Sequence, residues 1–199
     1  MRKGGLKIAN ISKKDSIINA ALKLFSNNGY HKTTVSQIAK EAKVAKGTVY
    51  WYFDSKKQLF QAIILTGVER LTSQIESRVK EKDDVLDKLK SIVMIYLEFI
   101  NKARQHFKVF QEGMIAVIDN DFKDRMMAFR SEQAEFIAAI IEQGKNENKV
   151  RLDVDNKDMA YLLLSMVTSF NDYLQGNNDF NIISKGDIII DVFLQGVAR

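Results

Sequence analysis

The sequence predicts an all-α protein: a three-helix domain over residues 1–54, joined by a long helix to a second helical domain over residues 55–199. Three observations predict it. None of the 199 residues is a proline, the residue that most strongly breaks or kinks the interior of a helix. Apolar residues recur every three to four positions, which is the spacing of a helix with one buried face. The length allows one large core or two smaller ones.

Composition argues against several classes of function. The chain has no cysteine, which excludes disulfides, thiolate metal sites and a cysteine nucleophile. Its two histidines, His31 and His106, are too few for a multi-histidine metal site. No apolar run approaches the roughly 18 residues of a membrane helix, and the basic N-terminal stretch has no signal-peptide core. We therefore expect a cytoplasmic protein with no metal, no cofactor and no membrane partner.

The first helix is expected over residues 13–28. Ser12 can cap its N-terminus, Asp15 stands in the reciprocal capping-box position, and Gly29 ends it. Apolar side chains repeat on one face between these limits, so the helix should pack against its neighbours. After the next two short helices, further helices are expected over residues 55–80, 83–102, 105–118, 121–143, 156–175 and 184–197.

Two short helices joined by a tight turn follow in the most basic part of the chain. Thr34 and Gln37 form a capping box for the first, a break over residues 43–45 ends it, and the second spans residues 46–52. Residues 1–60 have a net charge of +9, whereas the rest of the chain has −4. Concentrated positive charge suits contact with a polyanion, although a lysine-rich surface facing solvent has the same composition.

These features fit a helix-turn-helix over residues 34–53, whose second helix would enter the major groove of DNA. The free N–H groups at the start of that helix favour phosphate. Gly47 lets the backbone approach DNA closely, and Lys46 and Thr48 can donate hydrogen bonds to bases or phosphates.

Residues 13–60 resemble the DNA-binding domain of the TetR family of repressors, without a gap. The resemblance implies that Lys46, Gly47 and Thr48 meet bases or the adjacent backbone. It rests on Thr34-Val35-Ser36-Gln37-Ile38-Ala39, Ala42, Val44, Lys46-Gly47-Thr48, Tyr50, Tyr52-Phe53, Ser55-Lys56 and Leu59. It implies phosphate contacts for Tyr50, Tyr52 and Lys56. The DNA-binding residues expected from motif and resemblance together are Thr34, Ser36, Lys43, Lys46, Gly47, Thr48, Tyr50, Trp51, Tyr52 and Lys56.

The chain departs from the family pattern at the turn. Lys43 stands where the family usually has glycine, and it adds a charge that can reach phosphate. Ala45 stands where the family usually has serine, and an alanine N-cap is less stable by about 0.5–2 kcal/mol. Trp51 stays open between packing on the first helix or Tyr30 and stacking on the sugar-phosphate edge of the DNA. Tyr50 and Tyr52 stay open between half-buried packing and phosphate contact.

By the same resemblance, the second domain should hold a small-molecule pocket and a dimer interface. Aromatic and methionine side chains suit an adaptable apolar pocket, but the same spacing is typical of an ordinary helical core. The charge of the effector stays open, because Glu98 and Glu112 would favour a cation, whereas Arg104 and Lys108 would favour an acid. The candidate pocket residues are Tyr96, Phe99, His106, Phe110, Gln111, Met114, Met127, Phe170, Asn171 and Tyr173.

The last two predicted helices have wide apolar faces, which suit a four-helix interface in a homodimer. Such a dimer would place two recognition helices about 34 Å apart, on pseudo-palindromic double-stranded operator DNA. We expect a ligand-responsive transcriptional regulator, a repressor in the first instance, that a small and largely hydrophobic effector releases. A helical carrier of hydrophobic ligands is the rival, and it should lack salt-dependent DNA affinity. An enzyme is not supported, because no nucleophile–base pair or glycine-rich phosphate loop occurs.

Overall fold

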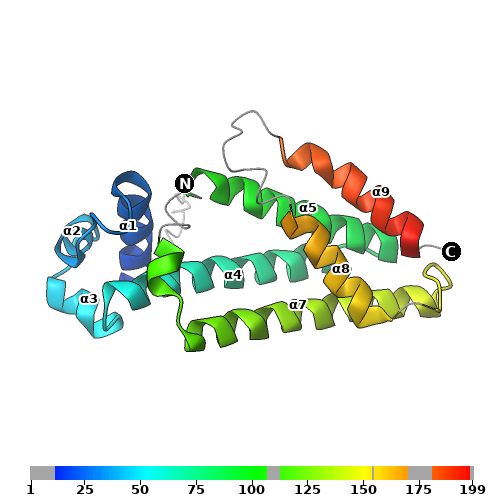
Figure 1. Ribbon diagram of the computed structural model, residues 1–199, viewed down its shortest axis with the longest axis horizontal. Coiled ribbons are helices and arrows are strands. Elements are labelled where there is room, and N and C mark those ends of the chain that lie inside the picture. The colour runs from blue at the N-terminus through cyan, green and yellow to red at the C-terminus, as the bar shows by residue number, and fades with distance from the viewer. Residues whose placement is uncertain (1–11, 107–112, 154, 170–180, 198–199) are drawn as a thin grey trace, which may run out of the picture. The chain divides into compact units, whose positions relative to one another are not determined.

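The structure is a computed structural model that describes residues 12–106, 113–153, 155–169 and 181–197, and its regular elements there are helices (Figure 1). The fold is all-α, as predicted. None of the helices in these ranges is long and apolar enough to cross a membrane.

The chain divides into two compact units. Among the described residues, the N-terminal unit holds residues 12–65 and 113–118, and the C-terminal unit holds the rest. The division after residue 65 differs from the expected boundary after residue 54, because the next helix begins inside the N-terminal core. Leu59, Phe60 and Ile63 of that helix are buried with the first three helices.

The N-terminal unit begins with α1 (Lys13–Asn28), α2 (Val35–Glu41) and α3 (Lys46–Tyr52), which Figure 1 shows as one group. The bounds of α1 and α3 are those predicted, and those of α1 are set by local caps. The Ser12 hydroxyl accepts the N–H of Asp15 at 3.1 Å, and Gly29 ends α1 at a positive φ of 84°.

Aromatic rings form the centre of the N-terminal core. The ring centroids of Phe25 and Tyr30 lie 5.5 Å apart, and Phe60 lies 5.4 Å from Phe25 and 5.1 Å from Tyr30. Such tilted and edge-on contacts add to the free energy of burying the rings. Val117 is buried in the same core, and its carbonyl accepts a hydrogen bond from the Gln61 amide at 2.8 Å. Residues 113–118 are therefore part of this unit.

The C-terminal unit is built around α5 (Val85–Ala103), which packs against α7 (Asn120–Asn146), α8 (Asn156–Thr168) and α9 (Gly186–Val197). In Figure 1, α9 runs alongside α5, and α8 crosses α7. The helix α4 (Lys56–Lys80) starts in the N-terminal unit and ends in this one. Two 3₁₀ turns lie at Arg104–His106 and Ile183–Lys185, and residues 113–117 form a further short helical segment.

Two sequence expectations are corrected here. The helix expected over residues 105–118 is described as a 3₁₀ turn through His106 and a helix over 113–117, and the residues between lie outside the described part. The break expected to begin at Gly144 is instead the last turn of α7. A Cβ at Gly144 would lie only 2.6 Å from Val150 and 2.9 Å from Val85, so this glycine permits close packing rather than ending the helix.

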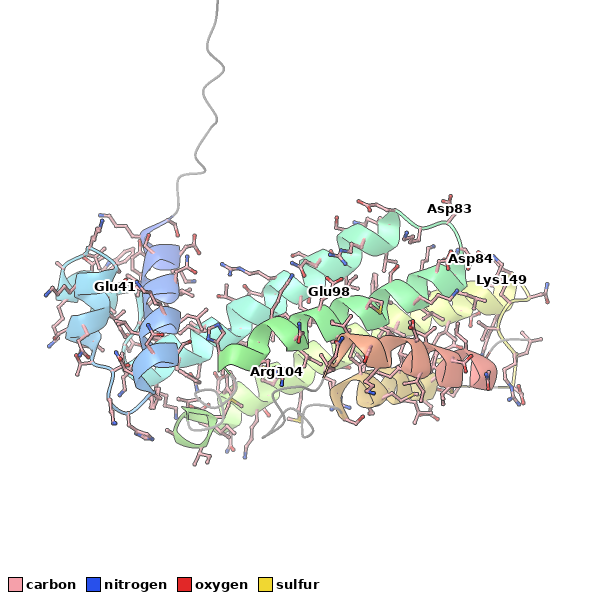
Figure 2. All side chains as sticks on the ribbon, turned by 90° about the horizontal axis from the view of Figure 1, so that it is seen from above. Glu41, Asp83, Asp84, Glu98, Arg104 and Lys149 are labelled. Atoms are coloured by element: carbon pink, nitrogen blue, oxygen red, sulfur yellow. The ribbon has the colours of Figure 1, made fainter. Side chains whose placement is uncertain are left out.

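An ion pair joins the start of α5 to the chain segment after α7, as Figure 2 shows for Asp84 and Lys149. Asp84 caps α5 by accepting the N–H groups of Leu86 and Asp87, and its other oxygen lies 2.8 Å from the Lys149 ammonium. The hydrogen bond from Lys149 and the cap hold the pKa of Asp84 below its usual value.

Candidate DNA-binding and effector sites

The helix-turn-helix has the local structure that its sequence predicts. The Thr34 hydroxyl accepts the N–H of Gln37, and the Gln37 side chain accepts the N–H of Thr34 at 2.8 Å, so the capping box is formed. Val49 and Phe53 are buried and fix α3 against its neighbours. The opposite side of α3 is therefore presented outward.

The backbone of the turn between α2 and α3 shows what each departure from the family pattern costs. Lys43 has a positive φ of 55°, a left-handed conformation that glycine adopts without strain and lysine does not. Ala45 has the extended backbone of an N-cap, with φ −68° and ψ 147°, but no side-chain oxygen to accept an N–H of α3. The first turn of α3 is thus less stabilised than a serine cap would make it.

The outward face of α3 carries large side chains in solvent. Trp51 is 77% exposed and Tyr50 is 46% exposed, and the Lys46 ammonium lies 5.8 Å from the centre of the Tyr50 ring. Packing of Trp51 on the first helix is therefore wrong; its ring contacts Tyr52 edge-on, at 4.5 Å. Tyr52 is half-buried against the N-terminal core, which favours the packing interpretation for that residue.

The remaining predicted DNA-binding positions differ in surroundings. A Cβ at Gly47 would meet no atom within 4 Å, so packing within the protein does not require a glycine there. Ser36 and Lys43 are exposed, and Thr48 is half-buried. Thr34 is exposed, but its hydroxyl is engaged in the capping box.

Lys56 has a role that the sequence did not suggest. Its ammonium donates to the carbonyls of Tyr30 at 3.0 Å, Thr33 at 3.1 Å and His31 at 3.4 Å, and it lies 4.4 Å from the centre of the Tyr30 ring. An ammonium has three N–H donors, so these carbonyls use all of them. Burial lowers the pKa of Lys56. In this structure Lys56 anchors the loop before α2, and the predicted phosphate contact would require it to leave these partners.

The C-terminal unit contains a cavity of about 320 Å³. Tyr96 and Met127 were both predicted to line a pocket, and both line this one. The list of candidate pocket residues does not include the other lining residues, because the helical spacing of apolar residues does not say which face of a helix meets a cavity. The lining consists of Tyr96, Met126, Met127, Phe129, Arg130, Gln133, Leu164 and Thr168.

A chain of hydrogen bonds leads from the cavity wall to α4. The Tyr96 hydroxyl donates to the Gln133 side-chain oxygen at 3.3 Å, and the Gln133 amide donates to the Thr72 hydroxyl at 3.2 Å. The Thr72 hydroxyl in turn donates to the carbonyl of Val68, also on α4, at 3.3 Å. Burial raises the pKa of Tyr96, so its phenol is neutral at physiological pH.

Other predicted pocket residues lie elsewhere. Phe99 packs against the C-terminal core, and His106 lies half-buried in a 3₁₀ turn, where burial lowers its pKa. Met114 packs against the core of the N-terminal unit, to which residues 113–118 belong, and it does not line this cavity. The predicted Phe110, Gln111, Phe170, Asn171 and Tyr173 lie outside the described residues.

The structure describes two of the four charged residues that were considered for the charge of the effector. Glu98 forms an ion pair with Arg78 at 3.1 Å and does not line the cavity. Arg104 lies in the 3₁₀ turn that follows α5, whereas Glu112 and Lys108 lie outside the described part. Within the described residues, no group of three or more histidine or acidic side chains could hold a metal ion.

The last helices expose apolar side chains. Leu162 on α8 and Ile188 and Val192 on α9 are each more than half exposed. They alternate with buried residues such as Leu163 and Ile189, which belong to the C-terminal core. Both helices therefore have an apolar side that is exposed among the described residues.

Comparison with known proteins gives matches over most of the chain. The family model described as bacterial regulatory proteins, tetR family, matches residues 17–63, and the tetracyclin repressor-like C-terminal domain matches residues 82–174. The HTH-type transcriptional regulator UidR of Escherichia coli K12 is 28% identical over 154 residues, 75% of each chain. The fatty acid metabolism regulator protein of Bacillus subtilis is 18% identical over 182 residues, 91% of this chain and 93% of that one.

A solved structure shows the same fold. The transcriptional regulator FadR from Bacillus subtilis in complex with stearoyl-CoA superposes with a TM-score of 0.77. It is 19% identical and covers 91% of this chain and 97% of its own. The proteins matched are regulators rather than enzymes.

Proposed function

Because the chain belongs to the TetR family of transcriptional regulators, we propose that it is a repressor that binds pseudo-palindromic operator DNA as a homodimer and is released by a small, largely apolar effector. The exposed face of α3 carries this proposal: Lys46, Tyr50 and Trp51 stand in solvent while the other side of the helix is buried. We assign DNA binding to residues 1–54, and effector binding and dimerisation to residues 55–199.

DNA binding follows from the chemistry of α3. Its N-terminal turn would enter the major groove, where Lys46 can donate to guanine or to phosphate. The open space at Gly47 would let the backbone come close to the DNA. Tyr50 can donate to a phosphate oxygen, and Trp51 can stack on the sugar edge. The net charge of +9 over residues 1–60 adds attraction that is independent of base sequence.

Dimerisation would use α8 and α9. Large apolar side chains that stay exposed on a helix pair mark a surface for association. Leu162, Ile188 and Val192 are already nearly half buried, so covering the rest of each would contribute about 1 kcal/mol, roughly half the value for a fully exposed side chain, before association entropy is subtracted. Two helices from each chain make a four-helix interface, which is self-complementary about a two-fold axis.

Effector control would pass through α4. The cavity wall is connected to this helix by the hydrogen bonds from Tyr96 to Gln133 and from Gln133 to Thr72. The first turns of α4 are buried in the N-terminal core, directly after the helix-turn-helix. An effector that binds the protein more tightly when α4 is in one arrangement than in another would shift the population toward that conformation and so change DNA binding.

The direct test is selection of duplexes from a random DNA library by the full chain, followed by fluorescence anisotropy at increasing salt. We expect a palindromic consensus with half-sites one helical turn apart, about 10 base pairs, and affinity that falls steeply with salt. A carrier that retains only the shape of a DNA-binding unit would give no consensus. That result would overturn the proposal.

A further inference from the structure

The cavity in the C-terminal unit has an accessible surface of apolar atoms only, although four of the described residues that line it have polar side chains. Two of the four, Tyr96 and Gln133, are buried. The Tyr96 hydroxyl donates to the Gln133 side-chain oxygen at 3.3 Å, and the Gln133 amide donates to the Thr72 hydroxyl at 3.2 Å. These two side chains therefore turn carbon atoms toward the cavity and use their polar atoms within the protein.

The other two polar side chains are also turned away. The Thr168 hydroxyl donates to the carbonyl of Leu164, one turn earlier on α8, at 2.9 Å. The Arg130 guanidinium donates at 3.1 Å to the hydroxyl of Ser165, which does not line the cavity. Arg130 thus contributes its apolar stem to the wall, while its charged end lies outside the cavity.

We propose that this cavity takes an uncharged, apolar molecule and binds it by shape and burial alone, without an ion pair or a hydrogen bond. This inference rests on the proposed function, since it takes the cavity to be the effector site. A charged or hydrogen-bonding group that entered the cavity would lose its water and meet no partner, which would weaken binding. The effector charge that the sequence leaves open is therefore neither positive nor negative, and the effector is neutral.

The volume limits the size of the molecule. About 320 Å³ is at the small end of the range for small-molecule pockets, which is roughly 300–1,000 Å³. At about 30 Å³ for each group of the size of a water molecule, the cavity holds about ten such groups. Two aromatic rings and two methionine side chains form much of its wall, and both kinds of side chain pack well on a flat ring system. Naphthalene, a hydrocarbon of that size, is therefore the matched probe.

The test is equilibrium dialysis of the full chain against naphthalene and three derivatives that each add one polar group to the same rings. The derivatives are 2-naphthol, which is neutral, 2-naphthoate, which is an anion, and 2-naphthylmethylamine, which is a cation at neutral pH. We expect naphthalene to bind most tightly and both ions to bind about tenfold more weakly or worse, because their charges find no partner in the cavity. Either ion binding as tightly as naphthalene would overturn the inference.

Substitutions locate the bound probe. Met126→Trp puts a larger side chain into the wall and should weaken naphthalene binding about tenfold or more. The matched control is Ala128→Trp, at an exposed position of the same helix away from the lining, which should leave the affinity within about twofold. Arg130→Met removes the charge and keeps an unbranched apolar stem, so the order of the four probes should stay the same. Urea unfolding shows that each variant is folded.

Three results would count against this inference in different ways. Naphthalene binding that a folded Met126→Trp variant leaves unchanged would place the probe elsewhere and overturn it. A changed order of the probes in Arg130→Met would show that the guanidinium does act on the ligand, and this would overturn it too. Binding of no probe would overturn both the inference and the assignment of the cavity as the effector site. The operator selection described above is independent of these results, so a failure of the DNA-binding proposal is seen separately.

Discussion

The side-chain amide of Gln133 donates a hydrogen bond to the hydroxyl of Thr72, 3.2 Å away, and so joins the wall of the cavity to α4. Gln133 is only 4% exposed, and its oxygen accepts from Tyr96. A buried amide with both ends paired is costly to replace, because its partners lose their hydrogen bonds inside the protein.

Replacing Gln133 by leucine should therefore have two effects. Unfolding in urea should show a loss of about 1–3 kcal/mol, because Tyr96 and Thr72 are left without this partner. Operator affinity should fall less on addition of effector than in the parent protein, because the link to α4 is broken. Gln74→Leu, at an exposed position of α4, is the control and should stay within about 0.5 kcal/mol. A full effector response in the Gln133 variant would show that the signal takes another route.

Lys43→Gly separates backbone strain from charge. Removing a non-glycine residue from the left-handed conformation should stabilise the protein by about 1 kcal/mol. Lys43→Ala keeps the strained backbone and should bring no such gain. If Lys43 contacts phosphate, both variants should lower the slope of log affinity against log salt by about 1. Equal stability of the glycine and alanine variants would contradict the assignment of strain.

Ala45→Ser should stabilise the start of α3. A serine hydroxyl at this N-cap can accept an N–H that now has no side-chain partner, a gain of about 0.5–2 kcal/mol in urea unfolding. Ala128→Ser, at an exposed position inside α7, offers no such N–H and should bring no gain. If the two substitutions have the same effect, Ala45 is not a deficient cap.

Lys56→Met tests whether this lysine anchors the loop or grips DNA. Loss of its hydrogen bonds to the carbonyls of Tyr30, His31 and Thr33 should destabilise the protein by about 1–3 kcal/mol. The salt slope of operator binding should hardly change. Lys40→Met, an exposed lysine on α2, controls for loss of charge alone. A slope lowered by about 1 with unchanged stability would instead support the phosphate contact.

Local signals predicted the N-terminal helices well. Ser12, Gly29 and Thr34 act on backbone groups a few residues away, so the sequence alone defines where α1 ends and α2 begins. The positive φ at Lys43 was indicated only indirectly, by the glycine that the family usually has there.

Tertiary contacts were harder to predict. The sequence predicts a break at Gly144, because nothing local shows that this glycine packs against Val150, in the segment that follows the helix. Gln133 and Arg130 were missed as pocket residues because polar side chains on a helix usually face solvent. No local pattern shows that residues 113–118 pack with the N-terminal unit, so the sequence could not place Met114.

The most direct test of the central claim is operator affinity of the double variant Lys46→Ala and Tyr50→Ala, measured by fluorescence anisotropy on the selected duplex. Both side chains are exposed, so the free energy of unfolding should change by less than about 0.5 kcal/mol. We expect affinity to fall about 100-fold or more, because two contacts to the DNA are lost. Unchanged affinity in a folded variant would contradict the assignment of α3 as the helix that reads DNA.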